Sequence, residues 1–106
     1  MNRFVVVASV TECEAIRYTP AGVPILALHL EHESEVLEAK RPRRIQLSLS
    51  ALVVGELALE LNGKILGKHC RFEGFIAPSR KGSSRLRLHV QKVTPVAAEQ
   101  SPRLTD

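Results

Sequence analysis

The fold class is decided by two alternating stretches that flank a basic loop: Cys70-Arg71-Phe72-Glu73-Gly74-Phe75-Ile76, then Pro78-Ser79-Arg80-Lys81-Gly82-Ser83-Ser84, then Leu86-Arg87-Leu88-His89-Val90-Gln91. In both outer stretches apolar side chains recur at every second position, which is the period of a half-buried β-strand. The Ser- and Gly-containing segment between them is typical of a hairpin loop. Gly74 in the middle of a strand indicates a bulge or a close backbone approach. These residues therefore predict a β-hairpin with a basic loop.

Three more strands are predicted upstream. Residues 25–31 alternate leucines with a more polar set, and residues 45–50 place Gln46 and Ser48 outward. Both follow the period of a strand with one buried face. Residues 4–10 are apolar on both faces, so we expect them to be buried on both. The second face needs either a partner surface or a cover from the chain's own helix or loop.

Two connecting segments are less regular. Ser34–Arg44 is highly charged and is predicted to be a mobile loop with a basic end. Residues 51–61 fit a short helix, capped by Ser50 and ended by Asn62-Gly63, or an irregular connection. Five strands with this insertion between the third and fourth predict an all-β, five-stranded OB-fold Greek-key barrel. A β-sandwich is the alternative, but sandwiches usually contain more strands.

The chain length sets the domain organisation. The chain has 106 residues and a mass of 11.7 kDa, which fits one domain. We expect a domain over residues 1–94 and a flexible C-terminal tail over residues 95–106, where Ala, Ser, Pro and Glu dominate.

Charge is distributed unevenly along the chain. The whole chain has a formal net charge of +4, with 15 Lys and Arg against 11 Asp and Glu. Residues 1–39 hold 2 basic and 6 acidic residues, whereas residues 40–92 hold 12 basic and 3 acidic residues. A basic segment of this kind suggests a polyanionic partner, and the alternative is a solvated basic surface.

Several function classes lack the residues they need. The last residue, Asp106, is the only Asp, and Cys13 and Cys70 match no zinc spacing. His29 and His32 are three apart on a predicted strand, so they face opposite sides and cannot chelate one ion together. No signal peptide, membrane span, Walker motif or nucleophile elbow is recognisable. We therefore expect a cytoplasmic protein with reduced thiols, no metal, no cofactor and no catalytic residues.

The order of four short motifs resembles that of a known family. They are Tyr18-Thr19-Pro20-Ala21-Gly22-Val23-Pro24, Leu30-Glu31-His32-Glu33-Ser34, Phe72-Glu73-Gly74-Phe75-Ile76 and Leu86-Arg87-Leu88-His89-Val90. Over residues 2 to about 94 the chain resembles the family of bacterial primosomal replication protein N (PriB), a relative of single-stranded DNA-binding protein. The resemblance implies a homodimer that binds single-stranded DNA. It also implies a role in restarting stalled replication forks, in which the protein bridges a restart helicase and a helicase-loading primosome protein.

Binding a single strand without sequence preference needs a cationic groove and aromatic faces. The expected DNA-binding cations lie in two loops that rim the binding face of an OB-fold: Lys40, Arg41, Arg43 and Arg44, and Arg80, Lys81, Arg85 and the adjacent Arg87. Some family members place an aromatic residue on the outward face of the third strand. The matching position here is Gln46, or Ile45 if the register slips by one. Phe75 is the candidate stacking residue, with core or dimer packing as its alternative.

Two other functions fit the same composition. One is a protein–protein adaptor whose basic surface meets an acidic partner, and the other is an RNA-binding OB module.

Overall fold

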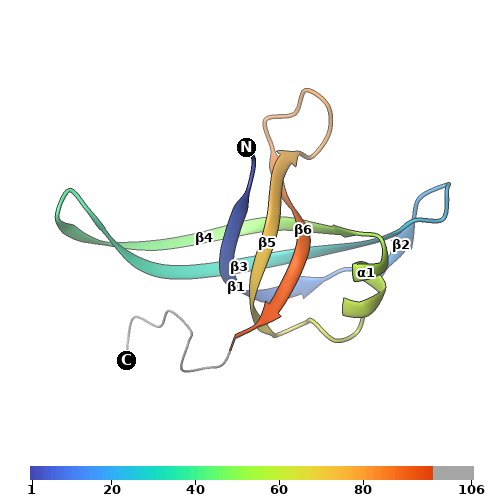
Figure 1. Cartoon of the computed structure of the whole chain (residues 1–106), viewed down its shortest axis with the longest axis horizontal. Helices are drawn as coiled ribbons and strands as arrows, with labels where there is room; N and C mark the ends of the chain where they lie inside the picture. The colour runs from blue at the N-terminus through green and yellow to red at the C-terminus, as the bar shows by residue number, and fades with distance from the viewer. Residues whose placement is uncertain (97–106) are drawn as a thin grey trace.

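A computed structural model describes residues 1–96 of the chain. The strands are β1 (Phe4–Cys13), β2 (Arg17–Tyr18), β3 (Pro24–Glu38), β4 (Arg41–Val54), β5 (His69–Pro78) and β6 (Leu86–Pro95), with one helix, α1 (Glu56–Leu61). They form one sheet in the order β1-β5-β6-β4-β3-β2, and an additional β1–β3 pairing closes it. The β4–β6 pairing is parallel. This closed barrel (Figure 1) has the strand order of an OB-fold, which confirms that prediction. Residues 97–106, most of the predicted tail, lie outside the described residues.

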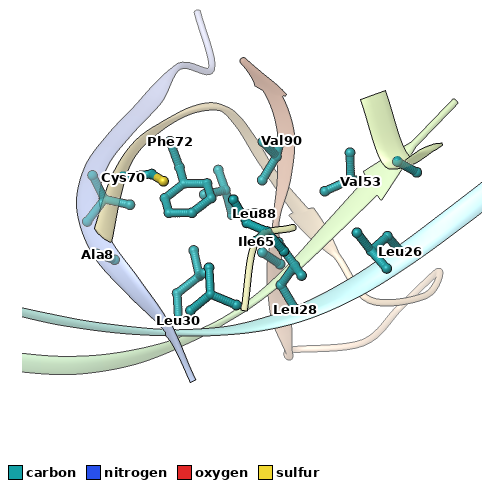
Figure 2. Packing of buried hydrophobic residues seen from close by; sticks show 14 residues of the cluster. Ala8, Leu26, Leu28, Leu30, Val53, Ile65, Cys70, Phe72, Leu88 and Val90 are labelled. Atoms are coloured by element: carbon teal, nitrogen blue, oxygen red, sulfur yellow. The ribbon is translucent and has the colours of Figure 1, made fainter. Parts of the chain in front are cut away.

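The core occupies the barrel interior. Phe72 is fully buried at its centre, and alternate residues of β1, β3, β5 and β6 surround it (Figure 2). Ala58 of α1 and Ile65 also belong to this cluster. Because side chains alternate across a strand, burial of one set turns the other set outward, toward any ligand.

The predicted loop at Ser34–Arg44 is wrong. β3 and β4 pair without interruption from Ile25–Val54 to Glu38–Arg41, and a two-residue turn at Ala39-Lys40 joins them. We call the part of this hairpin beyond its pairing with β1, residues 32–47, the arm (Figure 1). Both turn residues have positive φ, 53° and 66°, as a tight hairpin turn of type I′ requires. The sequence carries no Asn-Gly or Asp-Gly signal for such a turn.

Opposite charges stabilise the arm. Its β3 side carries glutamates, and its β4 side carries arginines in register with them, as in the Glu35–Arg44 pair. Arg43 donates a hydrogen bond to Glu38 over 2.6 Å. Opposite charges across strands contribute about 0.2–1 kcal/mol per pair. A charged segment that suggests solvation in the linear sequence therefore forms two complementary strands.

The helix is shorter than residues 51–61. Ser50 does not cap it, because β4 continues through the buried residues Ala51, Leu52 and Val53. Gly55, with φ of 97°, makes the turn into α1, and Asn62 ends the helix by donating its N–H to the Ala58 carbonyl. The predicted stop at Asn62-Gly63 is confirmed.

Candidate nucleic-acid interface

The loop between β5 and β6 forms a basic concavity of about 620 Å³, bounded by residues 79–85 and by Arg87 of β6. The loop is organised by its own hydrogen bonds, since Ser79 donates its N–H to the Arg85 carbonyl and Ser83 donates to the Arg80 carbonyl. Gly82, with φ of 78°, occupies the turn position that needs a positive φ. These hydrogen bonds and the turn at Gly82 organise the loop around the concavity.

The cations of this concavity carry uncompensated charge. Within residues 1–96, none of Arg80, Lys81, Arg85 and Arg87 forms an ion pair with a carboxylate. We call these four residues the cation cluster. Four unpaired positive charges around one concave surface favour the binding of a polyanion there.

The other predicted cations lie elsewhere. Arg43 is paired with Glu38, and Arg44 lies 3.7 Å from Glu33. Arg41 is in register with Glu38, and Lys40 is in the turn at the tip of the arm. Figure 1 shows the tip of the arm at one end of the molecule and the β5–β6 loop well away from it. The two basic segments therefore do not form a single patch.

The outward face of β3 and β4 is acidic, and Gln46 belongs to it. Gln46 donates its side-chain amide to Glu33 over 2.8 Å. Ser48 donates to Glu31 over 2.7 Å, and a ring nitrogen of His29 lies 2.9 Å from the same carboxylate. The hydrogen bond from Ser48, followed by that from His29, lowers the pKa of Glu31. On this face the Glu31 carboxylate therefore stays ionised to lower pH than usual.

A stacked ring pair occupies the outward face of β5 and β6. The rings of Phe75 and His89 lie 4.8 Å apart, centroid to centroid, with an interplanar angle of 10°. The two residues are direct partners in the β5–β6 register. Both rings are half-buried, so part of each remains in contact with solvent.

Gly74 makes this pair possible. A Cβ added at Gly74 would overlap the backbone carbonyl oxygen of His89. β6 can therefore approach β5 this closely only because β5 has a glycine at this position. The β5–β6 register also shifts between Glu73 and Gly74. The bulge and the close approach predicted for Gly74 are both confirmed.

Because Leu88 and Val90 alternate inward along residues 86–90, the sequence puts His89 on the outward face, but no local pattern indicates a role for it. The signal was present in the alternation of Arg87 and His89 along one strand. The missing information was the cross-strand register, because only pairing with β5 brings His89 against Phe75.

The remaining aromatic rings have other positions. Phe72 is buried, Phe4 packs against the core, and Tyr18 is 59% exposed at the end of β2. Trp is absent from the chain. Phe4 is partly buried like Phe75 but packs against the core, so Phe75, stacked on His89, is the better placed of the two for a ligand on the outward face.

The two thiols are poor nucleophiles at neutral pH. Burial raises the pKa of Cys70 and, together with the nearby Glu14 charge, that of Cys13. Among residues 1–96 no three His, Cys, Asp or Glu side chains are grouped so that they could hold a metal ion. In the same residues no helix has the length and apolar character to cross a membrane.

Solved structures define the class of the protein. An engineered single-stranded DNA-binding protein from Thermus aquaticus aligns with a TM-score of 0.74 over 95% of this chain and 53% of that chain, at 18% identity. That likeness concerns the fold alone, and it places the chain among OB-fold barrels. The PriB protein of Ralstonia solanacearum aligns with a TM-score of 0.80 and 35% identity over 90% of this chain and 97% of that chain.

Sequence relatives then define the family. A family model described as "Another single-strand binding protein family" matches residues 2–92. Replication restart protein PriB of Bordetella pertussis is 48% identical over 97 residues, which are 92% of this chain and 91% of the relative. The protein of the same name from Nitrosomonas europaea is 33% identical over 85% of this chain and 83% of the relative. The chain belongs to the PriB family of replication restart proteins.

Proposed function

We propose that this protein binds single-stranded DNA without catalysing a reaction and acts in the restart of stalled replication forks. The observation that carries the proposal is the cation cluster, which lines one concavity beside an OB-fold sheet and has no carboxylate partner in residues 1–96. Guanidinium and ammonium groups in such a place neutralise phosphates and release their condensed counterions. Binding is therefore expected to weaken steeply with salt and to show little sequence preference.

The arm would supply a second and weaker contact. Its cations, Lys40, Arg41, Arg43 and Arg44, share the arm with the glutamates of β3, which cancel much of their field. Gln46 already donates one amide N–H to Glu33, so it would meet a base beside that carboxylate. We therefore rank these residues below the cation cluster as contacts for DNA.

Membership of the PriB family supports the biological role. We propose that the protein is a primosome component that bridges a restart helicase and a helicase-loading protein. The separation of the arm from the cation cluster supports this role, since it leaves an extended surface for protein partners while DNA occupies the β5–β6 side.

We also propose that the protein is a homodimer formed through β1. Residues Phe4–Ser9 pair with β5 on one edge, whereas β3 pairs with β1 only from Ser9 onward. The other edge of Phe4–Ala8 therefore has no strand beside it in residues 1–96. Val5 on this segment is 41% exposed. An apolar strand edge promotes aggregation unless it is covered, and a second copy would cover it symmetrically. Sedimentation equilibrium at micromolar concentration should show a dimer, and a purely monomeric species would contradict this.

The domain boundaries belong to the same proposal. We propose that residues 1–94 form the DNA-binding domain and residues 95–106 a flexible tail. Because Pro95 ends β6 and Val96 donates its N–H to the His69 carbonyl, the test deletes residues 97–106 only. This deletion should leave DNA binding and the cooperative unfolding transition unchanged.

Anisotropy titrations with labelled oligonucleotides test the function. The protein should bind single-stranded DNA at low salt more tightly than a duplex of the same sequence. Tighter binding to RNA of the same sequence would favour an RNA-binding module instead. Failure to bind any oligonucleotide at low salt, together with binding to an acidic protein partner, would favour an adaptor.

A further inference from the structure

We infer that bases of the bound strand stack on the Phe75–His89 pair, so that the nucleic acid crosses the outward face of β5 and β6 and not that of β3 and β4. This inference rests on the proposed function. It names the route and the stacking residues of that site.

The first argument is continuity with the cation cluster. Arg87 lines the basic concavity and lies two residues before His89 on β6, so both side chains project from the same face. In the register, Arg87 faces Ala77 of β5, and His89 faces Phe75. A strand whose phosphates occupy the concavity therefore meets the ring pair next along the sheet.

The second argument is the charge of the two faces. On the outward face of β5 the carboxylate is Glu73, which accepts a hydrogen bond from Arg3 over 2.7 Å and lies 3.8 Å from Arg71. Lys92 of β6 is also in register with Glu73. Cations therefore outnumber carboxylates beside the ring pair.

The face of β3 and β4 has the opposite balance. Glu31 and Glu33 project from it, and Ser48 and Gln46, which donate hydrogen bonds to them, are neutral. Arg44 lies 3.7 Å from Glu33 and the His29 ring lies 2.9 Å from Glu31, so two carboxylates stand against one arginine here. Phosphates following this route would approach Glu31 and Glu33. Like charges in such proximity repel, so the route over β5 and β6 is electrostatically favoured.

The third argument is the geometry of the rings. Parallel rings with centroids 4.8 Å apart have the offset arrangement that aromatic pairs prefer. The pair is held by the backbone, because Gly74 allows β6 to approach β5 closely at this point. A base that stacks on the solvent-facing part of either ring extends an existing stack. Such a site accepts every base, but only when the base is unpaired.

Anisotropy titrations of the full chain with a single-stranded oligonucleotide test the inference. Because stacking is worth about 1–3 kcal/mol per base, Phe75→Ala and His89→Ala should each weaken binding roughly 5- to 150-fold. The dependence of affinity on salt should stay as in the unmodified protein, since neither ring contacts a phosphate. His89→Phe keeps a stacking ring and should retain most of the affinity.

A second measurement separates stacking from loss of structure. An oligonucleotide containing 2-aminopurine should lose fluorescence when the unmodified protein or His89→Phe binds it, and much less when Phe75→Ala does. Leu59→Ala, which truncates an exposed side chain on α1, serves as a control and should bind like the unmodified protein. Thermal unfolding followed by circular dichroism checks that each variant is folded.

The outcomes distinguish the inference from the proposed function. If folded Phe75→Ala and His89→Ala bind as tightly as the unmodified protein while loss of the loop cations weakens binding, the stacking site is wrong and the proposed function stands. A larger loss from Gln46→Ala or Tyr18→Ala than from Phe75→Ala would move the strand to another face and would also overturn the inference. If the unmodified protein binds no oligonucleotide, both proposals fail together.

Discussion

Replacing Arg80, Lys81 and Arg85 together by Ala should weaken binding to single strands of any sequence by a similar factor. The reason is that these side chains are expected to contact phosphates, which carry no sequence information. None of the three forms an ion pair within residues 1–96, so their full charge is available to DNA. The protein should remain folded, because the three side chains are exposed and surface changes usually stay within about 0.5 kcal/mol.

The size of the effect follows from counterion release. Each phosphate contact with a single strand contributes about 0.7 to the slope of log affinity against log salt, so three lost contacts lower the slope by about 2. Between 50 and 200 mM salt, the unmodified protein should therefore lose roughly 20-fold more affinity than the variant loses.

The assay is an anisotropy titration of each protein at several salt concentrations with homopolymeric and mixed oligonucleotides. Lys64→Ala/Lys68→Ala, which removes two positive charges, is the control for net charge, since both lysines line a different concavity from that of the cation cluster. It should change the slope little. A folded triple variant with an unchanged slope would show that the loop does not touch phosphates, and the reasoning would be refuted.

Three further predictions concern the fold and its titrating groups. Gly74→Ala should lower the free energy of unfolding by about 1–3 kcal/mol, because the added methyl group overlaps the backbone of His89; chemical denaturation measures this, and an unchanged midpoint would contradict it. Ser48→Ala should raise the pKa of Glu31 toward its ordinary value, because the hydrogen bond from Ser48 is the largest cause of its depression. That bond therefore stabilises the fold above the ordinary carboxyl pKa and is lost as pH falls through the lowered one, which a carboxyl NMR titration would follow. Cys70 should react with iodoacetamide slowly at neutral pH and quickly after unfolding, because burial raises the pKa of its thiol; equal rates would show that the thiol is accessible.

The barrel could be predicted because alternation is a local property. The leucines of β3 and the residues facing Phe72 recur at every second position, and their burial follows from that period. The arm could not be predicted in this way. Residues 34–38 and 41–44 are mostly charged, the apolar Val36 and Leu37 are adjacent rather than alternating, and no strand period appears. They are strands because each supplies the charges that the other lacks.

Only part of the candidate site could be predicted from the sequence. The basic loop was recognisable because Gly82 and the adjacent serines mark a turn between two alternating strands, and its cations are neighbours in sequence. The ring pair was not, since Phe75 and His89 lie on different strands and no local pattern states which residues face each other. Gln46 was predicted to be a DNA contact because its outward position follows from the strand period. Its hydrogen bond to Glu33 could not be predicted, because it depends on the cross-strand register.

By itself, the sequence determined the strand count of the barrel, the core-facing side of its strands and the position of the basic loop, because these depend on neighbours one or two residues apart. It did not determine the second face of β1, which was expected to be buried but leaves Val5 41% exposed in this chain. The tertiary structure alone decided the cross-strand register. That register joins Glu35 to Arg44 in the arm, brings carboxylates onto the face of β3 and β4, and sets His89 against Phe75 beside Gly74. Register depends on how the whole barrel closes around Phe72, and closure is a property of contacts between residues far apart in the chain.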